Sequence, residues 1–115
     1  MEYKDIRMPV DLPKPIAAYF AAENSGDGKA LASCFTEQGV VSDEKQTMAG
    51  RTAIQQWAAE TRKKYQHQTE PLASFQQDGK ITVTSRLSGN FPGSPIELRF
   101  VFRLAGDSIA SLEIG

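Results

Sequence analysis

The amino-acid sequence predicts a single α+β domain in which helices pack on a largely antiparallel sheet. Apolar residues recur with the helical period of 3.6 in residues 12–23 and again in residues 51–65. After residue 67 the period changes to two, which is typical of half-buried strands. Because the helical segments come first and the strands follow as a meander, the order favours a segregated α+β fold over a parallel α/β sheet.

The first predicted helix carries an apolar stripe that ends in one charged residue. Asp11 precedes the stripe and is a candidate for its N-cap, and residues 24–26 form a stop signal. Glu23 is the exception to the apolar character of this face. The stripe consists of residues that share one side of a helix: Leu12, Ile16, Tyr19, Phe20 and Glu23.

A short second helix and a strand pair are expected next. Asp27 is a suitable N-cap, and the apolar residues from 30 to 35 lie on one side, so we interpret Cys34 as part of the core rather than as a nucleophile. Gly39 is expected to break the chain before a short strand at 40–43, which returns at 46–49. The clearest helix then covers residues 51–65.

The remaining chain predicts four strands that pair as antiparallel neighbours. Their expected positions are residues 68–77, 80–91, 95–105 and 108–114. Asp78-Gly79 is a strong hairpin signal between the first two, and two further turns follow at residues 92–94 and 106–107.

Composition favours one globular domain without a structural metal. The chain has 115 residues, of which 40% are hydrophobic and 23% charged, values that argue against disorder. We divide it into an N-terminal arm at 1–11 and a domain at 12–115. A single His and a single Cys cannot form a Cys/His zinc site, and no phosphate loop or dinucleotide fingerprint is present. We therefore expect neither a metal nor another cofactor.

The charge balance argues against nucleic acid and membrane partners. Thirteen basic and fourteen acidic residues give a net charge of -1, so there is no basic field for nucleic acid or anionic lipid. The longest apolar run, residues 16–22, is far shorter than the roughly 20 residues of a membrane span. One cysteine cannot form an intrachain disulfide, which fits a reducing compartment, and we expect the cytoplasm.

Three local motifs resemble the nuclear transport factor 2-like superfamily, also called SnoaL-like. Residues 30–41 resemble its passage from the second helix to the first strand, and Gly-Arg-Thr-Ala-Ile at 50–54 resembles the entry to its third helix. Residues 89–95 resemble a turn in small bacterial members of unassigned function. The resemblance covers residues 12–114. It implies a cystatin-like cone, in which helices pack on a curved antiparallel or mixed sheet that encloses a pocket.

Partial resemblance to the ketosteroid isomerase branch suggests two catalytic candidates. Asp43 falls where that branch keeps its general base, and Tyr19 falls where it keeps a tyrosine that donates to an oxyanion. Phe100 stands where an acid donor is expected, and Ala58 replaces a supporting aromatic residue. Because half of the oxyanion machinery is missing, we do not expect steroid isomerisation itself.

Each candidate also has a structural alternative. Tyr19 could be a core aromatic residue with a hydrated hydroxyl, and Asp43 a turn aspartate. His67 could act as a base or ligand, or could simply be a polar residue at the start of an edge strand. The other ligand-binding candidates could line a pocket or belong to the core: Trp57, Phe91 and Phe100.

Two functional hypotheses remain open at this stage. The first is a small-molecule enzyme of the isomerase, cyclase or hydrolase kind, or a carrier, that takes a small apolar or aromatic ligand. The second is a non-catalytic module that dimerises or binds a partner. In both cases we expect a homodimer formed through the outer sheet face, where Val101 is flanked by Arg99 and Arg103.

Overall fold

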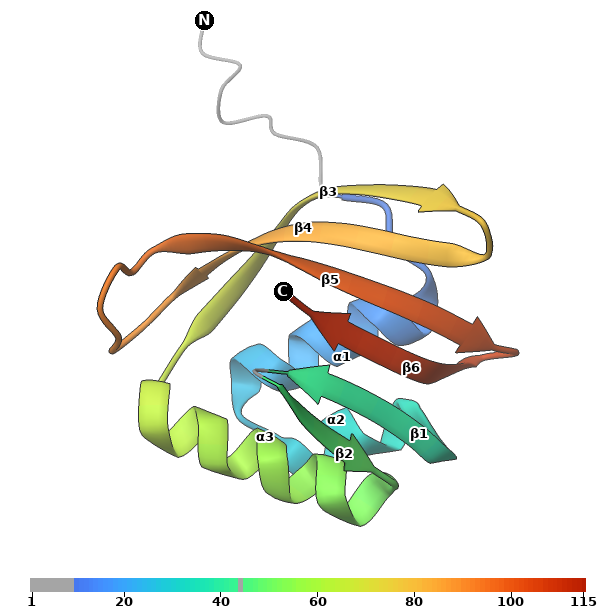
Figure 1. Ribbon diagram of the computed structural model, residues 1–115, viewed down its shortest axis with the longest axis horizontal. Coiled ribbons are helices and arrows are strands. Elements are labelled where there is room, and N and C mark those ends of the chain that lie inside the picture. The colour runs from blue at the N-terminus through green and yellow to red at the C-terminus, as the bar shows by residue number, and fades with distance from the viewer. Residues whose placement is uncertain (1–9, 44) are drawn as a thin grey trace, which may run out of the picture.

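The computed structural model describes residues 10–43 and 45–115, and it shows three helices on one side of a six-stranded sheet (Figure 1). The helices are α1 (Lys14–Ser25), α2 (Gly28–Ser33) and α3 (Arg51–Tyr65). The strands are β1 (Phe35–Asp43), β2 (Gln46–Ala49), β3 (Gln68–Gln77), β4 (Lys80–Ser88), β5 (Ile96–Ala105) and β6 (Ser108–Ile114). Most of the predicted arm at 1–11 lies outside the described residues.

The sheet is mixed, with strand order β2-β1-β6-β5-β4-β3. Strands β3 to β6 pair as antiparallel neighbours, which confirms the predicted meander. The exception is the pairing of β1 with β6, which is parallel. The last strand therefore lies inside the sheet and joins the β2–β1 pair to the meander.

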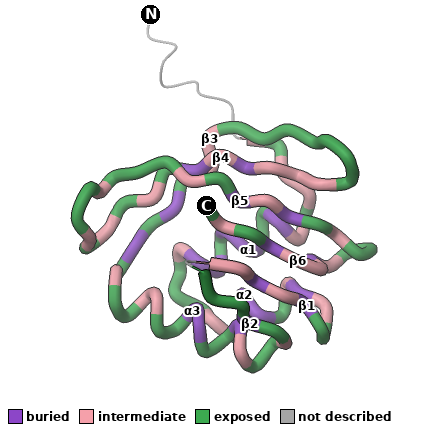
Figure 2. Tube along the Cα trace, viewed as in Figure 1, coloured by how far each residue is buried: buried purple, intermediate pink, exposed green. Residues whose placement is uncertain are grey.

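An aromatic cluster fills the space between α1 and the middle of the sheet. Five rings meet there, mostly edge to face, an arrangement that aromatic quadrupoles favour. All are buried: Tyr19, Phe20, Phe35, Phe100 and Phe102. Figure 2 shows buried positions along the helices and central strands, whereas the far end of β3 is exposed. Within the described residues, no helix combines the length and apolar character needed to span a membrane.

The helix boundaries agree with the sequence except at the first N-cap. Helix α3 has the predicted bounds, and Asp27 caps α2 by accepting a hydrogen bond from the backbone of Ala30 at 3.0 Å. Asp11 is not the cap of α1, however. Pro13 occupies that position, and its side chain has no hydrogen-bonding group; Pro15 follows in the first turn, where a missing backbone N–H is tolerated.

The region around Gly39 differs from the prediction. Gly39 does not break the chain but lies inside β1, which begins at Phe35 rather than at residue 40. The register between β1 and β6 shifts between Phe35 and Val40, so the glycine marks a bulge. A Cβ atom on Gly39 would lie 2.8 Å from that of Phe35, which explains why glycine is needed there.

The loop between β4 and β5 rests on the turn between α3 and β3. β4 ends at Ser88 instead of residue 91, and β5 begins at residue 96. The backbone N–H of Asn90 donates to the carbonyl of Tyr65 at 2.7 Å. A Cβ atom on Gly89 would lie 2.7 Å from that carbonyl oxygen and 2.9 Å from the Cα of His67. Only glycine allows the two segments to approach this closely.

We expect Gly89→Ala to lower the free energy of unfolding by about 1–3 kcal/mol, because the added methyl group must push apart two backbone segments. Chemical denaturation followed by circular dichroism measures the change. The control is Ser88→Ala at the exposed neighbouring position, which should change stability by less than about 0.5 kcal/mol. Equal stability of the two variants would show that the approach is not tight in solution.

Candidate functional site

A pocket of about 70 Å³ opens between the helices and the concave face of the sheet. Its apolar wall comes from β4, β5 and β6, and its polar groups come from α1, α3 and the ends of β1 and β3. The lining residues are Glu23, Asp43, Trp57, Thr61, Tyr65, His67, Leu87, Leu98, Phe100 and Ile114. Such a mainly apolar pocket with a few polar groups is typical of small-molecule sites.

Asp43 lies at the rim of this pocket, at the end of β1. It is opposite Gln46 of β2 and beside Ile114 of β6, so two strands fix its backbone. The indole Nε1–H of Trp57, on α3, donates to Oδ2 of Asp43 at 3.1 Å. This bond joins the carboxylate to the helix layer and holds it beside the apolar wall.

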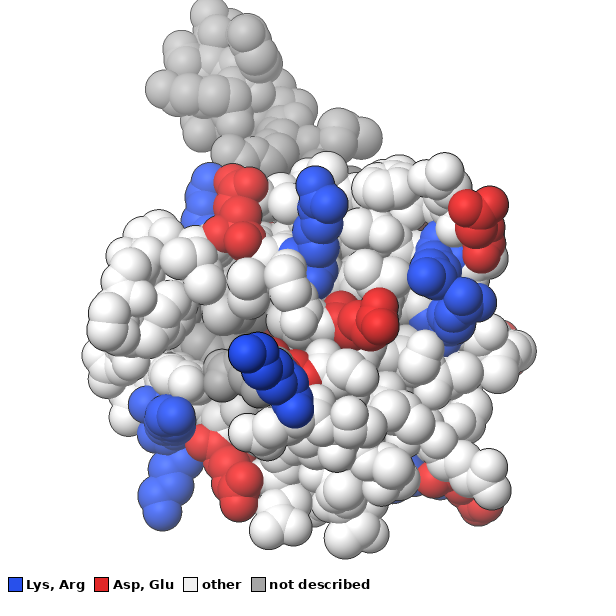
Figure 3. Space-filling model, viewed as in Figure 1, with Lys and Arg blue, Asp and Glu red and all other residues white. Residues whose placement is uncertain are grey.

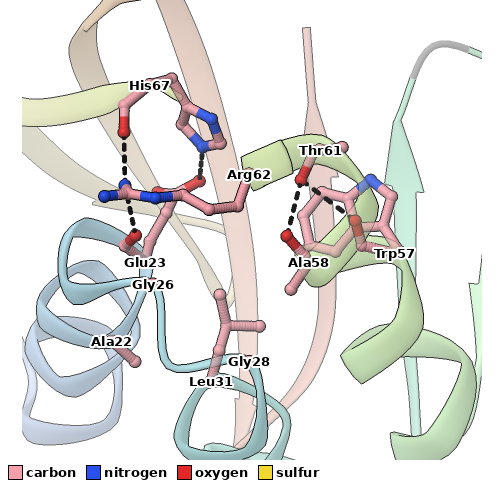
Figure 4. A pocket seen from close by; sticks show the side chains of 10 residues that line it. All are labelled: Ala22, Glu23, Gly26, Gly28, Leu31, Trp57, Ala58, Thr61, Arg62 and His67. Atoms are coloured by element: carbon pink, nitrogen blue, oxygen red, sulfur yellow. Dashed lines mark hydrogen bonds and ion pairs between the residues drawn. The ribbon is translucent and has the colours of Figure 1, made fainter. Parts of the chain in front are cut away.

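A carboxylate–imidazole pair lies deeper in the same pocket. Oε2 of Glu23, at the end of α1, is 3.1 Å from Nε2 of His67, directly before β3. Figure 4 shows the pair from a second, neighbouring pocket, which is lined by residues of α1, α2 and α3 together with the pair. Both side chains are buried. An ionised carboxylate only accepts hydrogen bonds, so with Glu23 ionised the Nε2 atom carries the hydrogen.

Backbone contacts fix the position of this pair. Nη1 of Arg62 donates to the carbonyl of His67 at 2.7 Å and to that of Glu23 at 3.4 Å (Figure 4). The amide of Asn24 makes two bonds with the backbone of Thr69: its Nδ2 donates to the carbonyl at 2.8 Å, and its Oδ1 accepts from the N–H at 2.7 Å. The end of α1 and the start of β3 are thus held together on both sides of the pair.

Tyr19 is not among the residues that line the pocket with Asp43, although the resemblance had suggested it as an oxyanion donor to the same substrate. Its ring is fully buried among aromatic rings, 5.5 Å from Phe102 and 6.4 Å from Phe100 between centroids. Its hydroxyl has no hydrogen-bond partner within the described residues. Burial, reinforced by the charges of Glu23 and Asp43, raises the pKa of Tyr19 well above its ordinary value. The phenol is therefore a neutral core group.

Of the other candidate residues, some line the pocket and others do not. Trp57, His67 and Phe100 line the pocket together with Asp43. Phe91 is not among the lining residues and instead packs edge to face on Tyr65, with 5.9 Å between ring centroids. Cys34 is half-buried against the core, as expected for a structural thiol, and burial raises its pKa.

Glu23 is a site residue that was not predicted from the sequence. The sequence does contain one indication of its role: Glu23 is the one charged residue on the otherwise apolar face of the first helix. A charged residue on a core-facing stripe is rarely buried without a partner, so it pointed to one elsewhere in the fold. Among the described residues, no group of three or more His, Cys, Asp or Glu side chains could hold a metal ion.

Comparison with protein families identifies the fold at the sequence level. The SnoaL-like domain family matches residues 16–112, so the chain belongs to the SnoaL-like family. A search of curated proteins gave no match.

Solved structures agree with this assignment. A candidate polyketide cyclase from Sinorhizobium meliloti is 34% identical over the whole of both chains, with a TM-score of 0.86. A Catenulispora acidiphila protein with a ketosteroid isomerase-like fold, in complex with trimethylamine, is 22% identical, with a TM-score of 0.80 over 91% of this chain and 86% of its own. SalBIII, an epoxide hydrolase/cyclase-like enzyme of pyran ring formation in salinomycin, is 24% identical. Its TM-score is 0.74, and the match covers 88% of this chain and 86% of SalBIII.

We expect Tyr19→Phe to keep or raise the free energy of unfolding, by up to about 1.5 kcal/mol, because it removes a buried hydroxyl that lacks a partner. Thermal unfolding of the variant and the wild type measures the difference. A large loss of stability would show that the hydroxyl is bonded in solution.

The same variant carries a pH-dependent signature. The folded-state pKa of Tyr19 is raised, so the unfolded chain loses this proton first and stability falls as pH rises above about 10. Tyr19→Phe should lose less stability than the wild type between about pH 9 and 11. Parallel plots of the free energy of unfolding against pH for the two proteins would contradict the burial of the phenol. Other groups titrate in this range in both proteins, so the difference between the curves is the measurement.

Proposed function

We propose that this chain is a small-molecule enzyme of the isomerase, cyclase or hydrolase kind, with Asp43 as its general base. The observation that carries the proposal is the position of the Asp43 carboxylate, bonded to the indole of Trp57 at the rim of a mainly apolar pocket. A carboxylate beside apolar groups is partly desolvated, which strengthens it as a base.

The shape of the pocket supports a small, largely apolar or aromatic ligand. Phe100, Leu87 and Leu98 offer a hydrocarbon wall, and the polar groups come from the helices, from the end of β1 and from the residue before β3. A volume of about 70 Å³ holds only the reacting part of a ligand, so the rest would extend past the rim near Asp43.

Relatives point to the same class of chemistry. One similar structure is a candidate polyketide cyclase, and another is an epoxide hydrolase/cyclase-like enzyme. Ring closure and epoxide opening both need a group that moves a proton at a desolvated site. The fold also carries proteins of other functions, so the proposal rests on Asp43 and the pocket rather than on the fold alone.

We expect Asp43→Asn to lower turnover by about 10²–10⁴-fold, because the amide cannot accept the proton. The assay is product formation from a panel of epoxides and enolisable ketones. Trp57→Phe is the matched control: it removes the hydrogen bond to Asp43 but keeps the base, so its loss should be smaller. Circular dichroism checks that both variants fold. Full activity of Asp43→Asn would overturn the assignment of the base.

We also propose that two copies of the chain pair through the outer sheet face. One row across four strands carries Phe75, Thr82, Val101 and Glu113 in register, and Phe75 is 56% exposed. Arg99 and Arg103 flank Val101 along β5, and Glu113 lies opposite Val101 on β6, so this face carries both signs of charge around an apolar residue. Charges of both signs are interspersed on the face in Figure 3, which disfavours a strongly charged partner.

Light scattering at micromolar concentration should show a species of twice 12.6 kDa. Val101→Glu should shift it to the monomer, because a charge would be buried at the centre of the interface. Gln56→Glu adds the same charge at an exposed position of α3 and should leave the dimer intact. A monomeric wild type at this concentration would contradict pairing.

A further inference from the structure

The Glu23–His67 pair has no part in the proposed role of Asp43, although it lines the same pocket. We propose that this pair is a second proton-transfer centre, in which His67 gives a proton from Nδ1 to a substrate oxygen and Glu23 positions the ring. The inference deepens the proposed function and rests on it. It assigns a catalytic role to His67 and a positioning role to Glu23.

The unused hydrogen-bonding capacity of the pair is the first argument. His67 Nδ1 and Glu23 Oε1 are both buried, and neither has a hydrogen-bond partner in the part of the chain that the structure describes. A buried polar atom without a partner costs free energy, so a pair kept only for packing would be a poor solution. A ligand group in the pocket would satisfy the imidazole nitrogen.

The fixed orientation of the ring is the second argument. The Glu23 carboxylate engages Nε2, which leaves Nδ1 for the ligand. A carboxylate that sets the tautomer of a catalytic imidazole is a recurring arrangement in enzymes. The Arg62 and Asn24 contacts hold the backbones on both sides, so the pair keeps its geometry on binding. Because Nδ1 is buried, a ligand must displace a neighbouring side chain of the pocket wall to reach it.

Two other polar groups of the pocket are already engaged. The indole N–H of Trp57 donates to Asp43, and the hydroxyl of Thr61 donates to the backbone carbonyls of Trp57 and Ala58 at 3.0 and 3.2 Å. His67 therefore offers the ligand a nitrogen that no described residue uses.

The proton movements balance without a further reactant. Asp43 takes a proton from the carbon beside a carbonyl group; the C–H electron pair forms a C=C bond, and the carbonyl π pair moves to oxygen. That oxygen takes the proton from Nδ1 of protonated His67, which leaves a neutral ring still bonded to Glu23 through Nε2–H. Return of the two protons, one to a different carbon and one to His67, completes an isomerisation.

The charges of the lining also define the substrate class. Two carboxylates and one imidazole line the pocket, and none of its described lining residues is Lys or Arg; the guanidinium of Arg62 lies behind the pair, on the backbone carbonyls of Glu23 and His67. An anionic substrate would meet repulsion from Asp43 and Glu23. We therefore infer a neutral ketone or aldehyde with an acidic neighbouring C–H bond.

Two unique reporters make the test independent of the natural substrate. The chain has one histidine and one tryptophan, so the imidazole nitrogens and the indole N–H each give a single assignable NMR signal. The probe is cyclohexanone, a neutral ketone, and cyclohexanecarboxylate is its anionic counterpart. At a pH at which the spectrum itself shows hydrogen on both ring nitrogens, so that Nδ1–H can donate to the ketone oxygen, cyclohexanone should shift the signals of Trp57 and of His67 Nδ1, with Nε2 shifting less. The carboxylate should bind at least about 10-fold more weakly.

Three variants separate the roles. His67→Phe should raise the Kd for cyclohexanone, followed at the Trp57 indole, about 3- to 10-fold, the value of one hydrogen bond. Glu23→Gln keeps the shape of the side chain but removes its charge. In the neutral imidazole of His67, the hydrogen should then no longer prefer Nε2. Glu70→Gln, the control, removes a half-exposed carboxylate that pairs with Arg86 on the sheet and should change neither signal nor affinity.

The outcomes distinguish this inference from the proposed function. If cyclohexanone shifts the indole but neither nitrogen of His67, the pocket binds ligands and Asp43 keeps its role, but the imidazole is structural and the inference is overturned. If no signal moves at millimolar ketone, the pocket is not a ligand site and both proposals fall. Unchanged affinity in His67→Phe would overturn the proton-donor role even with Asp43→Asn inactive.

Discussion

The connection between the end of α1 and the start of β3 is the constraint on which the rest of the site depends. The Asn24 amide makes two bonds with the backbone of Thr69, and Arg62 joins the carbonyls of Glu23 and His67 from α3. Three elements that are distant in sequence therefore meet at one point. That meeting aligns the carboxylate with the imidazole and sets the width of the pocket between helices and sheet.

The aromatic cluster determines how much of the cone remains open. Large rings from α1, β1 and β5 fill the centre, so the pocket of about 70 Å³ lies to one side, toward Asp43 and the start of β3. Tyr19 belongs to this filling because Phe35 and Phe102 pack against its ring edge to face. The fold could in principle place a tyrosine in the pocket, but here the volume around that position is occupied by core.

The fold was largely predictable because its signals are local. Hydrophobic periods and turn residues define α3, the Asp27 cap and the β3–β6 meander within windows of a few residues. The start of β1 was not predictable from the sequence. A single apolar residue such as Phe35 fits a helix as well as a strand. The bulge at Gly39 is defined by the pairing of β1 with β6, which is distant in sequence. The site was predicted in part, and the Glu23–His67 contact spans 44 positions, beyond any local pattern.

The parallel pairing of β1 with β6 has a consequence for how the chain acquires its structure. The strand that leaves the ribosome after all the other described strands occupies an interior place in the sheet, between the β2–β1 pair and the β5–β4–β3 meander. Until it emerges, the two halves have no shared edge, and the hydrophobic faces of both stay open. Completion of this domain is thus a late, long-range event, which favours slow folding and a need for protection during synthesis.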